Sequence, residues 1–154
     1  MSKLTVFLDF DGVLNNEEDR SLQRGAFSPY NTHILSEFLD HIKDYEVVLS
    51  TAWRYYINHG HMTLKGMEIL LQTHSIGYAK QDFVVGQTLS KLSGSRQYEI
   101  KEYIEDKNVT NFLVLDDLDM KSSFGDRQIV CNSRLGFTRE QADRYLKTWK
   151  TSTH

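Results

Sequence analysis

The sequence lacks several features that would assign a protein to a particular class. Its 154 residues contain a single cysteine, Cys131, so an internal disulfide is excluded, which is typical of a reducing cytoplasm. No segment is long and apolar enough to span a bilayer. The apolar run near the N-terminus is interrupted by Asp9, so it does not form a signal peptide. These absences predict a cytoplasmic protein with no membrane partner.

Positive charge is not in excess either. The chain has 18 Lys and Arg residues against 21 Asp and Glu residues, which gives a formal net charge of −3. Such a chain has no general attraction for nucleic acids or anionic membranes, so any polyanion must be bound by a local basic patch. We find no repeat, low-complexity tract or interdomain linker. The length therefore predicts one domain over residues 1–154.

The most informative stretch is residues 4–15, Leu-Thr-Val-Phe-Leu-Asp-Phe-Asp-Gly-Val-Leu-Asn. Its apolar run shows no alternation, which predicts a parallel strand that is buried on both faces. Residues two apart on a strand project to the same side, so Asp9 and Asp11 should lie together while Phe10 points to the core. An isolated Asp-Phe-Asp-Gly is more often a polar turn that closes a strand. The remaining sequence decides between these two interpretations.

Two adjacent carboxylates repel each other, so they must share a proton or hold a cation between them. Oxygen ligands alone favour Mg²⁺. With a cation present, one carboxylate can attack phosphorus while the other donates and accepts a proton. Such phosphoryl transfer requires a hydroxyl for a phosphate oxygen, a positive side chain for the developing charge, and a further acidic residue.

Strand and helix patterns alternate along the rest of the chain. Four more apolar runs predict strands at residues 46–50, 82–85, 111–115 and 128–131. Ser28-Pro29, Ser95 and the Thr138–Gln141 capping box predict starts of helices. The apolar residues that indicate the helices are Ile34, Leu35, Phe38, Leu39, Ile42, Leu64, Met67, Ile69, Leu70, Leu71, Ile100, Tyr103, Ile104, Ala142, Tyr145, Leu146 and Trp149, of which the last four are expected to face inward. The alternation predicts an α/β fold with a doubly wound parallel sheet.

The connections between these elements are short. Residues 13–27 are mostly polar and charged, which predicts an exposed loop or small flap beside the first carboxylates. The spacing leaves no room for an inserted cap domain. Ligands of doubly wound sheets bind where the carboxyl ends of the strands meet. Three predicted strands end there in chemically useful residues, namely Asp9 and Asp11, Ser50 and Thr51, and Asp116 and Asp117.

This order of motifs resembles the haloacid dehalogenase (HAD) superfamily of phosphotransferases over nearly the whole chain. Residues 8–14 are similar to the first motif of that superfamily, residues 47–50 to the second and residues 114–117 to the fourth. More narrowly, Leu-Ser-Thr-Ala-Trp-Arg at residues 49–54, with the Leu-Asp-Asp ending at 115–117, resembles the small HAD domains of RNA-repair proteins. The phosphatase half of polynucleotide kinase-phosphatase is a related comparison.

The resemblance implies a role for each acidic residue. Asp9 would be the nucleophile that forms an aspartyl-phosphate, and Asp11 would be the general acid and then the general base. Asp116 and Asp117 would complete the Mg²⁺ site together with Asp9 and the main-chain carbonyl of Asp11. Which of Asp116 and Asp117 touches the metal stays open. Ser50 would bind a phosphoryl oxygen.

The cation of the third motif is assigned less directly. We select Arg96 because an arginine in the first turn of a helix opposes the helix dipole, a cost that is understandable if the residue binds a phosphate. The superfamily more often has a lysine, so Lys91 and Lys101 remain alternatives. Thr51 and Arg54 follow the second motif and are further candidates for substrate binding, with Trp53 between them as a core residue or a stacking surface.

The expected substrate is a phosphate at a nucleic-acid end or on a nucleotide. Capless HAD sites are associated with large substrates, and basic residues are expected near the mouth, namely Arg20, Arg24, Arg54, Lys91 and Arg96. The alternatives are a phosphatase of another macromolecule or a small metabolite, a signalling receiver domain, and a catalytically silent HAD-like binding module. The histidines show no metal-ligand spacing, and Cys131 is expected to be buried and inert. The sequence does not predict an oligomeric state.

Overall fold

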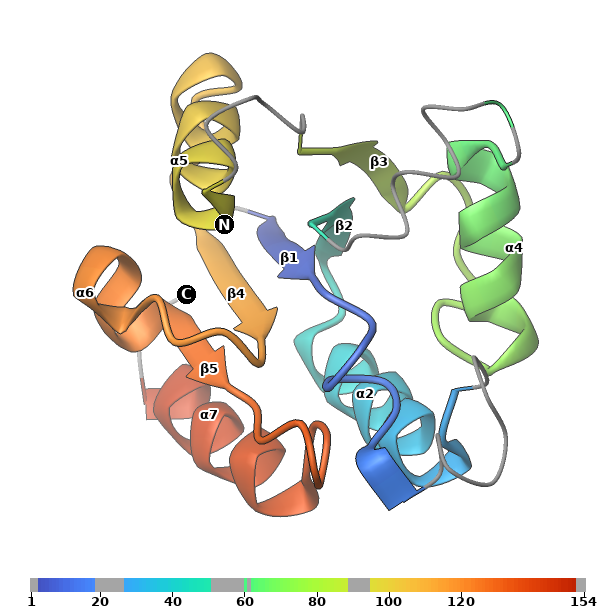
Figure 1. Ribbon diagram of the computed structural model, residues 1–154. Helices are drawn as coiled ribbons and strands as arrows, with labels where there is room; N and C mark the ends of the chain where they lie inside the picture. Colours follow the sequence, from blue (N-terminus) through green and yellow to red (C-terminus); the bar gives the residue numbers. More distant parts are fainter. Residues whose placement is uncertain (1–2, 19–26, 51–59, 61, 89–94, 152–154) are drawn as a thin grey trace.

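The computed structural model describes residues 3–18, 27–50, 60, 62–88 and 95–151 (Figure 1). The strands are β1 (Leu4–Leu8), β2 (Tyr45–Leu49), β3 (Val84–Gln87), β4 (Phe112–Asp116) and β5 (Gln128–Val130). The helices are α2 (Pro29–Ile42), α4 (Leu64–Thr73), α5 (Arg96–Asp106), α6 (Lys121–Phe124) and α7 (Arg139–Thr151), with a 3-10 turn at Gly125–Arg127.

All five strands are parallel and lie in the order β3-β2-β1-β4-β5. Helices α2, α4 and α7 cover one face of the sheet, and α5 and α6 cover the other. The predicted doubly wound α/β fold is therefore confirmed. The chain winds outward from β1 to β3 and then returns to β4 on the other side of β1. The switch point, where such sheets bind ligands, lies between β1 and β4.

Strand β1 is buried on both faces, as its unbroken apolar run predicts. Val6 and Leu8 pack in the cluster beneath α2, α4 and α7. Phe7 packs in the second cluster with Ile100 of α5. All of these side chains are inaccessible to solvent. Burying whole apolar side chains contributes about 1.5–3 kcal/mol each, so the first motif begins on a firmly held strand.

Helix starts agree with the predicted capping residues. Ser28 is the N-cap of α2 and Pro29 is its first residue, although the Ser28 hydroxyl makes no capping hydrogen bond. At α7 the box is complete, since the Thr138 N–H donates to Gln141 Oε1 and the Gln141 N–H donates to Thr138 Oγ1, both at 3.3 Å. Helices α2 and α7 pack against each other, with the rings of Phe38 and Tyr145 5.5 Å apart.

Two predictions about the middle of the chain were wrong in detail. The third strand begins at Val84 rather than Asp82, because the N–H groups of Asp82 and Val84 donate to the Glu68 carboxylate at 3.2 and 2.9 Å. The strand also ends at Gln87 rather than at Val85, so Gly86 lies inside it. Helix α4 forms as its apolar residues predict, with Met67 and Leu71 buried and Ile69 51% exposed.

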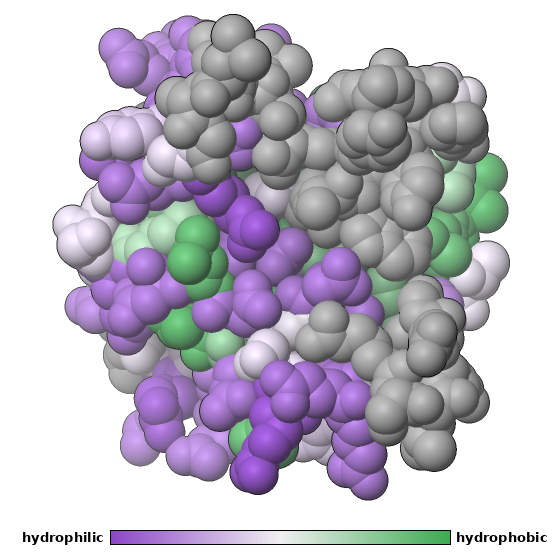
Figure 2. All heavy atoms as spheres, in the orientation of Figure 1, coloured by the Kyte–Doolittle hydropathy of each residue, from purple (hydrophilic) through white to green (hydrophobic). Residues whose placement is uncertain are grey.

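The exposed segment expected at residues 13–27 is buried at both ends. Val13 and Asn15 have no exposed surface, and Phe27 packs its ring 5.2 Å from the ring of Phe10. Residues 19–26, on which the middle of the expected flap falls, lie outside the described residues. In the orientation of Figure 2 the described surface is mostly hydrophilic, with hydrophobic side chains in small areas. None of the described helices is long and apolar enough to cross a membrane.

Candidate active site

Three aspartates meet at the switch point of the sheet. Asp9 directly follows β1, Asp116 ends the neighbouring strand β4, and Asp117 comes next. The two strands are in register here, since the Asp9 N–H donates to the Leu115 carbonyl at 3.0 Å. One carboxylate oxygen from each aspartate lies within 4.8 Å of the others. Asp9 and Asp116 are buried, and Asp117 is half-buried.

This crowding changes the acidity of the two buried aspartates. Burial and the neighbouring charge of Asp116 raise the pKa of Asp9 to about 8, although Arg96 opposes the shift. Burial also raises the pKa of Asp116 to about 6, again against the effect of Arg96. The described residues therefore do not compensate the full negative charge of the cluster.

The cluster fits a divalent cation. Its donors are all carboxylate oxygens, the ligand type that Mg²⁺ prefers. In addition, Asp116 Oδ2 is buried and has no hydrogen-bond partner among the residues that the structure describes. Buried carboxylate oxygens normally have partners, so this atom is suited to bind a cation. A cation here would also restore the ordinary acidity of Asp9 and Asp116.

Arg96 is the side chain that the structure brings into this cluster from α5. It is the first residue of the helix, and its Nη1 lies 2.5 Å from Asp116 Oδ1 and 3.4 Å from Asp9 Oδ2. Lys101, one of the two alternatives, is exposed, with its Nζ 5.9 Å from the ring centre of Tyr98. Lys91 lies outside the described residues. The placement of Arg96 supplies a positive charge beside the expected nucleophile.

Asp11 is half-buried and is not part of the three-aspartate cluster. Its Oδ1 accepts a hydrogen bond of 2.9 Å from Asn15 Nδ2, and Asn15 Oδ1 accepts one of 2.9 Å from the Gly12 N–H. Asn15 therefore orients Asp11 from within the same turn. Sequence reasoning placed Asn15 in a polar loop, and its only signal was an amide side chain four residues after Asp11.

Gly12 is required by this turn for two reasons. Its φ of +80° is in the left-handed region, which disfavours residues with a Cβ. A Cβ built there would lie 2.3 Å from Asp117 Oδ2. The turn that follows β1 thus passes directly against the Asp117 carboxylate, which joins the first and fourth motifs.

Ser50 follows β2 and is fully buried beside Asp9. Its N–H donates to the Leu8 carbonyl at 3.1 Å, so it occupies the position next to Asp9 on the adjacent strand. Several other predicted substrate-binding residues cannot be located in this way. Thr51, Arg54 and Lys91 lie outside the described residues, as do Arg20, Arg24 and Trp53.

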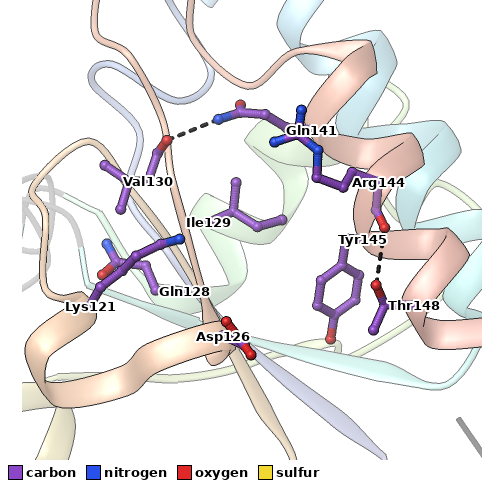
Figure 3. A pocket seen from close by; sticks show the side chains of 9 residues that line it. All are labelled: Lys121, Asp126, Gln128, Ile129, Val130, Gln141, Arg144, Tyr145 and Thr148. Atoms are coloured by element: carbon purple, nitrogen blue, oxygen red, sulfur yellow. Dashed lines mark hydrogen bonds between the residues drawn. The ribbon is translucent and has the colours of Figure 1, made fainter.

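A cavity of about 420 Å³ lies elsewhere, between β5, α6 and α7 (Figure 3). Lys121, Tyr145 and Thr148 are among its lining residues, whereas none of the three clustered aspartates lines it. Gln141, at its rim, donates to the outer carbonyl of Val130 at 2.9 Å. This bond covers part of the exposed edge of β5, which limits pairing with other strands.

Residues 5–142 match the family described as HAD domain in Swiss Army Knife RNA repair proteins. The chain belongs to this family. No curated protein and no solved structure matches it. The matched region runs from β1 into α7 and includes Asp9, Ser50, Arg96 and the Asp116–Asp117 pair. The predicted resemblance to small HAD domains of RNA repair is therefore confirmed, and the chain is assigned in general to the HAD-type phosphatases.

Proposed function

We propose that this protein is a Mg²⁺-dependent phosphomonoesterase that works through an aspartyl-phosphate on Asp9. The observation that carries the proposal is the group of three carboxylate oxygens within 4.8 Å at the switch point, with Arg96 against two of them. Asp9, Asp116 and Asp117 would hold the ion, with the main-chain carbonyl of Asp11 as a further ligand. When bound, Mg²⁺ supplies positive charge that compensates these carboxylates and the phosphoryl oxygens.

In the first half of the reaction, a carboxylate oxygen of Asp9 forms a bond to phosphorus, and the bond between phosphorus and the leaving oxygen breaks. Asp11, oriented by Asn15, donates a proton to that oxygen. The Ser50 hydroxyl donates a hydrogen bond to a phosphoryl oxygen. Arg96 offsets the charge that develops on the phosphoryl group.

In the second half, Asp11 accepts a proton from water while the water oxygen attacks phosphorus. The bond between phosphorus and the Asp9 oxygen breaks, which releases inorganic phosphate and restores the carboxylate. Asp11 ends protonated and is ready to act again as the acid. Each proposed step uses a side chain that follows or ends a strand at the carboxyl edge, or Arg96 of α5.

We propose phosphorylated nucleic-acid ends or nucleotides as the substrates. The RNA-repair family supports this choice, and the short connections after β1 and β2 support an open site without a cap domain. A phosphatase of another macromolecule or of a small metabolite is the second candidate. A silent binding module is disfavoured because none of the expected carboxylates is missing.

The first test is phosphate release from an aryl phosphate, with Mg²⁺ and with a chelator. We expect steady turnover only with the ion, and turnover that survives chelation would contradict the proposal. Asp143→Asn is the matched control for variants that remove a carboxylate of the cluster. It removes an exposed acidic charge on α7 away from the cluster, so its turnover should equal that of the wild type.

A second test addresses the substrate class. Binding of an end-phosphorylated oligonucleotide should weaken as salt is added, and Arg54→Ala should reduce that salt dependence while sparing hydrolysis of the aryl phosphate. Equal or higher kcat/KM for sugar phosphates, with Arg54→Ala affecting all substrates alike, would exclude the nucleic-acid assignment and leave the general phosphatase assignment.

A further inference from the structure

A row of four polar residues crosses the carboxyl edge of the sheet on adjacent strands. Leu8 of β1 is in register with Leu49 of β2 and Leu115 of β4, and Leu49 is in register with Gln87 of β3. The residues that follow these four form the row, and three backbone hydrogen bonds of 2.9–3.1 Å continue the ladders through it. In spatial order the row is Thr88, Ser50, Asp9 and Asp116.

The row faces the side of the sheet that α5 covers. Phe7, Val48 and Val114, two residues before Asp9, Ser50 and Asp116, all pack in the cluster under α5. Gly86, two residues before Thr88, also faces α5, because a Cβ there would lie 2.8 Å from the Tyr103 hydroxyl. Alternation along a strand therefore directs all four side chains of the row to the face on which α5 begins with Arg96.

Thr88 is the residue of this row to which the proposed reaction assigns no role. Its side chain has no exposed surface, and Thr88 Oγ1 has no hydrogen-bond partner among the described residues. Buried hydroxyls are normally hydrogen-bonded, since burial without a partner costs free energy. The Thr88 N–H is paired with the Leu49 carbonyl, so only the side chain needs a partner. A valine would fit a strand end better if packing were the only requirement.

We infer that Thr88 is a second phosphate-binding hydroxyl, which acts beside Ser50 on the group bound at Asp9. This inference rests on the proposed function. Neighbouring strands are about 4.8 Å apart, and a hydrogen bond between a hydroxyl and an oxygen spans about 2.7 Å. One phosphoryl oxygen between Thr88 and Ser50 can therefore accept a hydrogen bond from both. Thr88 Oγ1 would thereby gain a partner that none of the described residues provides.

The test compares three Thr88 variants by their binding of inorganic phosphate. Thr88→Val keeps the shape and removes the hydroxyl, Thr88→Ser keeps the hydroxyl and removes the methyl group, and Thr88→Ala removes both. The inhibition constant of phosphate is measured against aryl-phosphate hydrolysis. The melting temperature of each variant is measured with and without phosphate.

We expect Thr88→Val to weaken phosphate binding about tenfold, as loss of one hydrogen bond to a charged oxygen predicts. Its melting temperature without phosphate should equal or exceed that of the wild type, since the buried unpartnered hydroxyl is gone. Thr88→Ser should bind phosphate within about threefold of the wild type on the same basis, even if it melts lower. A structural role would instead lower stability in Thr88→Val and leave phosphate affinity unchanged.

Phosphate affinity in Thr88→Val within about twofold of the wild type would overturn the inference, because the expected hydrogen bond is worth more. Equal weakening in Thr88→Val and Thr88→Ser would also overturn it, since the hydroxyl would then not be the group that acts. If Thr88→Val does not fold, Thr88→Ala decides by the same criterion. A wild-type protein that neither hydrolyses aryl phosphate nor binds phosphate would reject the proposed function and this inference together, whereas normal turnover with an unaffected Thr88→Val rejects the inference alone.

Discussion

Two regions of this protein contain buried carboxylates, and these carboxylates differ in their hydrogen-bond partners and in the direction of their pKa shifts. Glu68 on α4 is 1% exposed, yet it accepts hydrogen bonds from the N–H groups of Val84 and Asp82 and pairs with Lys65 at 2.6 Å. Burial alone would raise its pKa, but the bonds from Lys65 and the two N–H groups outweigh burial and hold the pKa below its ordinary value. This carboxylate is fully used in holding β3 against α4.

At the carboxyl edge of the sheet, the buried carboxylate of Asp116 has an oxygen, Oδ2, to which none of the described residues donates a hydrogen bond. Burial and mutual repulsion raise the pKa of Asp9 to about 8 and that of Asp116 to about 6, although Arg96 lies against both. The difference distinguishes a structural carboxylate from carboxylates that are suited to bind a cation. A buried charge with satisfied hydrogen bonds is compatible with a stable native state, whereas a buried charge without them lowers the stability of the native state unless a ligand compensates it.

The largest effect should come from Asp9→Asn. The amide keeps the shape of the side chain but cannot act as the nucleophile, and the uncatalysed reaction is extremely slow, so turnover should fall by at least about 10⁴-fold. The fold should persist, and in the absence of metal the variant should melt at or above the wild-type temperature because repulsion at the site is relieved. Activity within tenfold of the wild type would exclude Asp9 as the nucleophile.

The second effect concerns pH and metal. Because the pKa of Asp9 and that of Asp116 are raised in the folded state, the metal-free native protein holds protons that the unfolded chain has already released. Its free energy of unfolding should therefore fall by up to about 1.4 kcal/mol per pH unit for each group, through both aspartates from about pH 4 to 6 and through Asp9 alone from about pH 6 to 8. Denaturant titrations in chelator should show this slope, and millimolar Mg²⁺ should flatten it. A slope that is the same with and without Mg²⁺ would contradict the metal site.

Glu68→Ala should have the opposite character. It leaves the Val84 and Asp82 N–H groups without their acceptor, which should reduce the free energy of unfolding by about 2–3 kcal/mol. Since the pKa of Glu68 is lowered, the stabilisation that it provides is lost as pH falls below the ordinary range of a glutamate. Specific activity per folded molecule should be unchanged. A large loss of kcat in well-folded Glu68→Ala would contradict the assignment of Glu68 to a purely structural role.

The predictable parts of the site are those that local patterns determine. Asp9, Ser50 and Asp116 could be placed together because each follows an apolar run, and parallel strands end on one edge. Arg96 could be chosen because its position at a helix start is electrostatically unfavourable. These choices required only the spacing of apolar residues in each helix and strand and the parallel direction of the strands.

The parts that could not be predicted depend on partners distant in sequence. Glu68 reads as an ordinary polar residue of an amphipathic helix until β3 is placed beside it. From the sequence alone, Thr88 resembles a loop residue. Its position in the row of polar residues depends on an irregularity in the pairing of β2 and β3, which the sequence pattern does not reveal. Buried polar residues have no periodic signal of their own, so their roles become visible only once the sheet order is known.

Asn15 provides the smallest test of the comparison. Like Glu68 it is buried and hydrogen-bonded, but it lies beside the proposed catalytic residues. Its amide joins Asp11 Oδ1 to the Gly12 N–H, with both bonds at 2.9 Å. Asn15→Ala should lower kcat about tenfold, because Asp11 loses the bond that orients it, while KM changes little. The loss of stability should be about 1 kcal/mol or slightly more. An Asn15→Asp variant restores an acceptor for Gly12 but not a donor for Asp11, so it should recover stability more than kcat. Equal recovery of both would assign Asn15 to the turn alone and leave Asp11 oriented by other groups.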